Sequence, residues 1–90
     1  MNMRVIRKAV TANTPVTFKF DSAGSQFLVK NFTQDNITVG ILDSEVLIPA
    51  SSAQMVITRL EPSVADLTDT LTVTAAATDT TGVEIQCLSY

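Results

Sequence analysis

The chain has 90 residues, of which 46% are hydrophobic and 6% aromatic, and its formal net charge at pH 7 is −3. This length predicts a single domain, and no run approaches the roughly 20 apolar residues of a membrane-spanning helix. The absence of histidine removes the usual general base and the commonest metal ligand. With one cysteine, the chain has neither a zinc site nor an intrachain disulfide. These counts predict a domain that is not an enzyme and needs no cofactor or metal.

Charge is distributed unevenly along the chain. Residues 1–30 carry five of the six basic residues and one acidic residue, whereas residues 31–90 carry one basic and eight acidic residues. This asymmetry favours head-to-tail contact between copies, or docking of the basic segment on an acidic surface. Ordinary solvated charges on strand edges are the alternative. Without interleaved aromatic residues the basic residues do not make a nucleic-acid footprint, so no nucleic-acid partner is expected.

The N-terminal segment differs from the rest of the chain. Residues 1–12 mix Arg4, Arg7 and Lys8 with aliphatic residues, which predicts a basic arm or an edge strand beside one β-sandwich domain over residues 13–90. The segment lacks the long apolar core of a signal peptide, so we expect synthesis in the cytoplasm.

From residue 14 onward, apolar side chains occupy every second position in short runs, as in half-buried antiparallel strands. These runs cover residues 14–21, 26–32, 37–42, 46–48, 53–60, 69–77 and 83–88. Polar residues predict hairpin connections at 33–36 and 78–82, and Gly24 predicts a turn with a positive φ. Gly40 predicts a bulge or a close backbone approach, and residues 61–68 an irregular piece with room for one helical turn. The pattern predicts an all-β, antiparallel β-sandwich of seven to eight short strands, Ig-like or jelly-roll-like.

Two carboxylate pairs are the strongest candidates for a cation site. Asp43 and Glu45 flank a turn, and Asp66 and Asp69 lie in or beside the long irregular piece. Neither pair has the dense, regular ligand spacing of a calcium loop, so we interpret them as solvated turn residues or caps.

Cys87 and two asparagines carry modifiable groups for which we predict structural roles. Cys87 shares a strand face with Val83 and Ile85, which predicts a small buried hydrophobic residue. Asn31 and Asn36 begin glycosylation sequons, and we interpret both as residues of hairpin connections.

Four short motifs lie between Gln26 and Leu88. They are an apolar strand that ends in asparagine, an Ile-x-Val-Gly strand, an Ile-Pro-x-x-Ser clamp and a closing Gly-Val hairpin, at residues 29–31, 37–40, 48–52 and 82–85. Together they resemble small virion proteins of tailed bacteriophages, over about two-thirds of the chain. The resemblance implies a β-sandwich that decorates or cements a capsid, or forms a ring, fibre base or adaptor in the virion. No active-site residues come with it.

The expected function is therefore a head decoration or cement protein of a phage virion, which binds the major capsid protein or other virion proteins without contact to a membrane. Closed symmetry, with a trimer favoured, would cover its strand edges as a homo-oligomer. Alternatives are a tail, neck or fibre adaptor of the virion and a carbohydrate- or cell-surface-binding module. Interface contacts are predicted at Arg4, Arg7, Lys8, Phe32, Ile48, Met55 and Tyr90.

Overall fold

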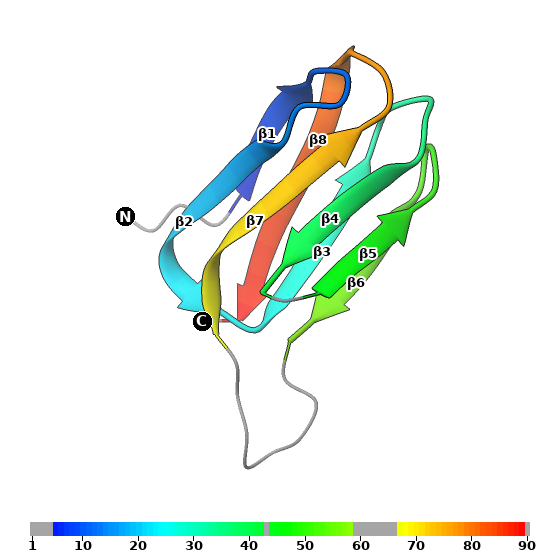
Figure 1. Cartoon of the computed structure of the whole chain (residues 1–90). Helices are drawn as coiled ribbons and strands as arrows, with labels where there is room; N and C mark the ends of the chain where they lie inside the picture. The colour runs from blue at the N-terminus through cyan, green and yellow to red at the C-terminus, as the bar shows by residue number, and fades with distance from the viewer. Residues whose placement is uncertain (1–4, 43, 59–66, 90) are drawn as a thin grey trace.

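The computed structural model describes residues 5–42, 44–58 and 67–89, which form eight β-strands. The strands are β1 (Val5–Val10), β2 (Val16–Gly24), β3 (Gln26–Asn31), β4 (Ile37–Ile41), β5 (Ser44–Ile48), β6 (Ala53–Ile57), β7 (Thr68–Ala75) and β8 (Asp79–Ser89). They build two four-stranded antiparallel sheets, in the orders β1-β8-β3-β6 and β2-β7-β4-β5, which lie face to face (Figure 1). The predicted all-β sandwich of seven to eight strands is confirmed.

The strand pairing is nested. β1 pairs with β8, β2 with β7, β3 with β6, and β4 with β5, always antiparallel. The chain therefore forms one long hairpin with its tip between β4 and β5. This hairpin is wrapped so that β8 also pairs with β3 and β7 also pairs with β4. Two four-stranded sheets in this order are the arrangement of a jelly roll, the second of the two predicted topologies.

Alternation of side chains explains why the two sheets pack. In β3, β4, β7 and β8 every second side chain is buried, and the buried set meets between the sheets. Phe20 of β2 and Phe27 of β3 are in contact across this core, with ring centroids 5.6 Å apart. Each large apolar side chain buried in this way contributes about 1.5–3 kcal/mol relative to an exposed one. The hydrophobic core comprises Val10, Phe18, Phe20, Phe27, Val29, Ile37, Val39, Ile41, Ile48, Val56, Leu71, Val73, Ala75, Val83, Ile85 and Cys87.

Both predicted hairpins are wrong, because the two strands that flank each connection do not pair with each other. β3 and β4, which flank residues 33–36, lie in opposite sheets, and so do β7 and β8. Residues 79–82 belong to β8 itself. Turn residues mark where the chain reverses, but the choice of the next strand's partner depends on distant segments. Here β8 lies between β1 and β3, whereas β7 lies between β2 and β4.

The glycines differ from the sequence predictions. Gly24 ends β2 without the predicted positive φ, and the chain bends at Ser25 instead. Gly82 is the glycine with a positive φ, of 73°. Neither the bulge nor the close backbone approach predicted at Gly40 is found. β4 pairs there without a register shift, and a Cβ would lie 2.6 Å from the side-chain Oγ1 of Thr72 but 3.8 Å from its carbonyl oxygen.

The described part of the N-terminal segment contains an edge strand. Residues 5–10 form β1, which pairs with β8 at the edge of its sheet and contributes Val10 to the hydrophobic core. β1 is therefore part of the sandwich. The helical turn considered within residues 61–68 falls mainly on 61–66, which lie outside the described residues, and Thr68 already belongs to β7.

Candidate functional site

The outer face of the β1-β8-β3-β6 sheet carries the residues that alternate with the core. Since Phe27 and Ile85 point inward, their neighbours along β3 and β8 point away from the core. The strand register aligns these outward side chains in two rows across the sheet. The rows are Val5, Gln86, Leu28 and Met55, and then Arg7, Glu84, Lys30 and Ala53.

Large hydrophobic side chains are concentrated on this face. Five of the eight exposed large hydrophobic residues in the described part of the chain lie here, and each is 42–49% exposed. We call them, together with the half-buried Leu28, the apolar face: Val5, Leu28, Phe32, Met55, Ile57 and Leu88. Exposed apolar residues that gather on one side of a small domain mark an interaction surface more than single scattered ones do.

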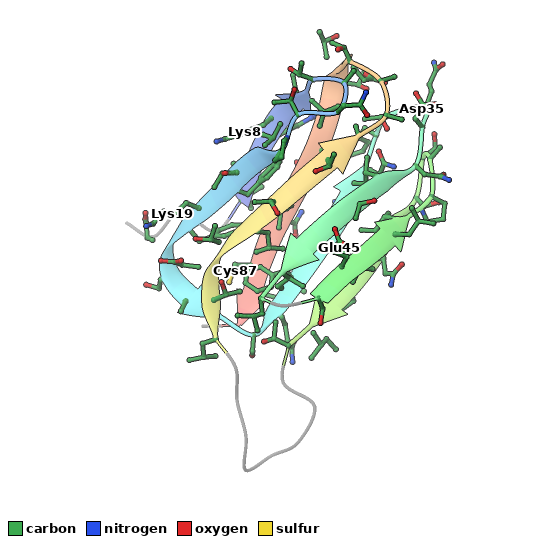
Figure 2. All side chains as sticks on the ribbon, viewed as in Figure 1. Lys8, Lys19, Asp35, Glu45 and Cys87 are labelled. Atoms are coloured by element: carbon green, nitrogen blue, oxygen red, sulfur yellow. The ribbon has the colours of Figure 1, made fainter. Side chains whose placement is uncertain are left out.

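The outer face of the other sheet has a different composition. Its outward positions on β2, β7 and β4 carry threonines, and Lys19 of β2 and Glu45 of β5 lie at its two edges (Figure 2). Leu47 of β5 is an exposed large hydrophobic residue of this face. Leu42, which follows β4, and Leu67, which precedes β7, are the other two in the described part of the chain. Threonine suits the pleated surface of a β-strand. The two outer faces of the sandwich therefore differ in hydrophobicity, with large apolar side chains on one and threonines on the other.

Arg7 and Phe32 form the best-defined contact of the apolar face. The Arg7 guanidinium lies over the Phe32 ring, with Cζ 4.3 Å from the ring centroid. Its Nε and Nη2 also donate to the carbonyl oxygen of Thr81, at 3.2 and 2.9 Å. The Thr81 hydroxyl in turn shares its one proton between the Phe32 carbonyl oxygen and the Asp79 carboxylate. These contacts hold an aromatic ring at the surface, at a cation–π gain of about 0.5–1 kcal/mol for an exposed site.

An ion pair crosses the middle of the same face. Lys30 Nζ lies 3.6 Å from Glu84 Oε2, which also accepts a hydrogen bond from Gln86 Nε2 at 2.9 Å. An exposed pair of this kind contributes at most about 1 kcal/mol to stability. Its effect is to give the face one positive and one negative group beside the apolar residues.

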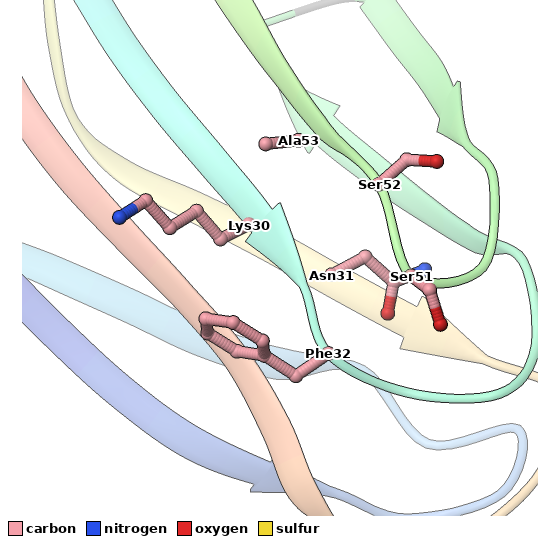
Figure 3. Close-up of a pocket in the computed structure, with 6 residues that line it drawn as sticks. All are labelled: Lys30, Asn31, Phe32, Ser51, Ser52 and Ala53. Carbon is pink, nitrogen blue, oxygen red and sulfur yellow. The ribbon is translucent and has the colours of Figure 1, made fainter.

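A pocket of about 230 Å³ extends the apolar face beyond the end of β3. Figure 3 shows the side chains of Lys30 and Phe32 on one side of it and the segment that leads into β6 on the other. The lining residues are Lys30, Asn31, Phe32, Ser51, Ser52 and Ala53. The pocket therefore combines an aromatic ring with hydroxyl groups and one ammonium.

A buried amide lies beneath this pocket. Asn31 is 2% exposed, and the two protons of its Nδ2 are shared among the carbonyl oxygens of Asp35, Ile48 and Pro49, at 2.9, 3.3 and 3.0 Å. Its Oδ1 accepts from the backbone nitrogen and hydroxyl of Thr33, at 2.9 and 2.7 Å. Asn31 thus joins the end of β3 to the β3–β4 and β5–β6 connections. Because its amide nitrogen is buried and bonded, the sequon it begins serves a structural role.

Three of the predicted interface residues lie together on the apolar-face side of the sheet. Arg7 and Met55 are outward residues of β1 and β6, and Phe32 follows β3 on the same side. Lys8 points elsewhere, because its Nζ donates to the Thr17 carbonyl oxygen of β2 at 2.8 Å. Sequence reasoning overlooked the outward apolar residues of β1, β3, β6 and β8, although their position out of phase with the core residues is a usable signal.

Ile48 is wrong as an interface residue. Its side chain is 0% exposed and belongs to the hydrophobic core, so it has no surface for a partner. The reason is its phase in β5, where it faces Ile37 of β4 on the inward side. Arg4 and Tyr90 lie outside the described residues.

The predicted carboxylate pairs are only partly within the described residues. Glu45 is exposed on β5, and Asp69 Oδ1 accepts a hydrogen bond from the Thr70 hydroxyl at 2.7 Å. Asp43 and Asp66 lie outside the described residues. Within the described ranges, no group of three or more potential metal-ligating side chains comes together.

Cys87 is buried between the sheets, as predicted (Figure 2). In the part of the chain that the structure describes, there is no helix with the length and hydrophobicity needed to cross a membrane.

Asp79 gives the fold a pH-dependent contact beside Arg7 and Phe32. The hydrogen bond from the Thr81 hydroxyl, followed by that from the Thr81 backbone nitrogen, lowers the pKa of Asp79 below its ordinary value of 3.8. Because the pKa of Asp79 is lower in the folded chain than in the unfolded chain, the ionised carboxylate stabilises the fold at pH values above 3.8. This stabilisation is lost as the pH falls through the pKa of the folded state. We expect Thr81→Val to weaken the fold at pH 7 and to reduce the dependence of the melting temperature on pH below about 4. Thermal melts of both proteins between neutral and acid pH will measure this, and an unchanged acid limb would contradict it.

Comparisons of the chain with protein-family models, with curated proteins and with solved structures give no match, so its function is inferred from the geometry described above.

Proposed function

We propose that this protein is a virion structural protein of a tailed bacteriophage, a head decoration or cement protein that binds the capsid surface through its apolar face. Its partners are the major capsid protein or other virion proteins, and it acts without catalysis as a homo-oligomer. It is made in the host cytoplasm and resides in the virion.

The observation that carries this proposal is the contrast between the two outer faces of the sandwich. One face gathers Val5, Phe32, Met55, Ile57 and Leu88 around a charged pair, whereas the other is mainly threonine. A hydrophobic centre with aromatic and arginine groups is the composition of protein–protein interfaces. Repetition of a modest contact over many sites of a shell produces strong overall attachment without any further chemistry.

The topology supports the proposal by analogy. Jelly rolls are a recurrent architecture of viral capsid domains, although the same fold also occurs in lectins and cupins. A fold does not define a function, so the proposal depends on the apolar face. The jelly-roll topology is consistent with it but does not carry it. The phage motifs of residues 29–31, 37–40, 48–52 and 82–85 agree as well.

Phe32→Ala is expected to weaken binding to capsid shells by about tenfold or more, because Phe32 supplies the aromatic ring of the apolar face and a few large anchors carry most of the binding energy of an interface. Phe32 is 42% exposed, so its loss leaves the hydrophobic core intact. The measurement is co-sedimentation with purified shells of the phage that encodes the chain, prepared without this protein.

Leu47→Ala is the matched control for this experiment. Leu47 is also an exposed large hydrophobic residue, but it lies on the opposite outer face, so its removal should leave shell binding unchanged. Equal losses for the two variants would refute the role of the apolar face. Failure of the wild-type protein to bind any shells, or its absence from purified virions, would refute the decoration function.

A second candidate function is a carbohydrate- or cell-surface-binding module, which the pocket of about 230 Å³ favours. The Phe32 ring offers a platform for the apolar side of a sugar, and Ser51 and Ser52 offer hydroxyl groups. Titration with glycans distinguishes the two candidates. Saturable binding that Phe32→Ala abolishes, without any affinity for shells, would favour the carbohydrate function.

A further inference from the structure

The four edge strands of the sandwich differ in how they are protected against pairing. An edge strand presents unpaired backbone groups, and charged residues, prolines and bulges normally discourage their use. β1 carries Arg7, Lys8 and a register shift, β2 carries Lys19, and β5 carries Glu45 and is followed directly by Pro49. β6 has the sequence AQMVI, without charge, proline, glycine or register shift. It is therefore the unprotected edge among the described strands.

The direction of the free backbone groups of β6 follows from two hydrogen bonds at its ends. Thr58 N donates to Ser25 O at 2.9 Å, and Asn31 N donates to Ser52 O at 2.8 Å. Even-numbered residues of this strand therefore direct their backbone groups toward β3, because the direction alternates along an antiparallel strand. The residues whose N–H and C=O groups point away from the sheet are Ala53, Met55 and Ile57.

We propose that a second copy of the chain pairs with this edge, β6 against β6 in antiparallel register, with the two-fold axis at Met55. Met55 then exchanges both hydrogen bonds with Met55 of the partner subunit. Ala53 does the same with Ile57 of the partner subunit, and Ile57 with Ala53 of the partner subunit. Every outward backbone group of the three residues gains a partner in this register, and no charged side chain of β6 opposes the contact.

The side chains of the same three residues agree with this register. Val56 faces Phe27 in the core, so Ala53, Met55 and Ile57 lie on the outer face. The pairing sets a small residue beside a large one at both ends and two flexible methionines at the centre, and such cross-strand neighbours stabilise a sheet. The two β1-β8-β3-β6 sheets become one continuous sheet, and the two apolar faces become one surface.

This contact predicts a dimer where the sequence pattern favoured a trimer. A two-fold contact uses the same surface on both copies and is complete with two of them. The inference goes beyond the capsid proposal and does not depend on it, since the dimer is measured in the absence of shells.

The first test compares Met55→Lys with Leu47→Lys by native mass spectrometry and sedimentation of the full chain. Both residues are exposed, at 43% and 60%, so neither lysine enters the core. We expect the wild type and Leu47→Lys to be dimers, and Met55→Lys, whose lysines meet at the two-fold axis, to dissociate at least about tenfold more readily. A monomeric wild type, or a Met55→Lys variant that still dimerises equally well, would overturn the proposal.

The second test addresses the register. Ala53→Lys with Ile57→Glu places opposite charges next to each other across the two-fold axis, whereas Ala53→Lys with Ile57→Lys places like charges there. Only the second double variant should lose the dimer, and circular dichroism with thermal melting checks that both are folded. Equal behaviour of two folded double variants would exclude this register.

Discussion

Asn31→Asp is expected to lower the free energy of unfolding at neutral pH by about 3–5 kcal/mol, the range for an uncompensated buried charge. The substitution keeps the shape of the side chain but replaces the amide nitrogen by oxygen. The carbonyl oxygens of Asp35, Ile48 and Pro49 then lose their donor and face a negative charge. Urea denaturation of both proteins measures the difference.

Asn36→Asp is the matched control. Asn36 is exposed, and its Oδ1 accepts a hydrogen bond from Ala50 N at 3.1 Å, a role that a carboxylate also fills. Its free energy of unfolding should change by no more than about 0.5 kcal/mol. Equal losses of stability in the two variants would show that the buried Asn31 amide does not hold the β3–β4 and β5–β6 connections together.

Gly82→Ala is expected to cost about 3 kcal/mol or more, of which the left-handed backbone accounts for roughly 1–2 kcal/mol. Gly82 has a φ of 73°, and a Cβ there would lie 2.1 Å from the carbonyl oxygen of Lys8. That contact is with backbone, so β1 has to move away from β8. We therefore expect faster amide hydrogen exchange in β1 as well as a lower midpoint of denaturation.

Gly40→Ala separates backbone strain from simple crowding. Gly40 has no positive φ, and a Cβ there would lie 2.6 Å from the side-chain oxygen of Thr72. The expected cost is about 1–2 kcal/mol, and Thr72→Ala in the same chain should recover most of it. Gly82→Ala has no equivalent rescue by one side chain. A cost at Gly82 no larger than that at Gly40 would contradict the assigned clash with β1.

The candidate site was predictable only in part. Arg7, Phe32 and Met55 were expected at an interface and do lie on one outer face, because charge, aromaticity and exposure leave a trace in the local pattern. Ile48 was misplaced, since its inward phase is settled by its pairing with Ile37. The apolar face combines residues from four strands, so no local window of the sequence contains it.

The sequence by itself determined the class of the fold. Alternation of apolar and polar residues is a local property with the period of a strand, and it identified the sandwich and the buried position of Cys87. Only the tertiary structure decided which strands are neighbours. Backbone N–H and C=O groups are chemically alike in every strand, so the local sequence does not specify which strand each one bonds to. The nested pairing of β1 with β8 and β3 with β6 buried the Asn31 amide, brought the residues of the apolar face together and placed β6 at the edge of its sheet among the described strands.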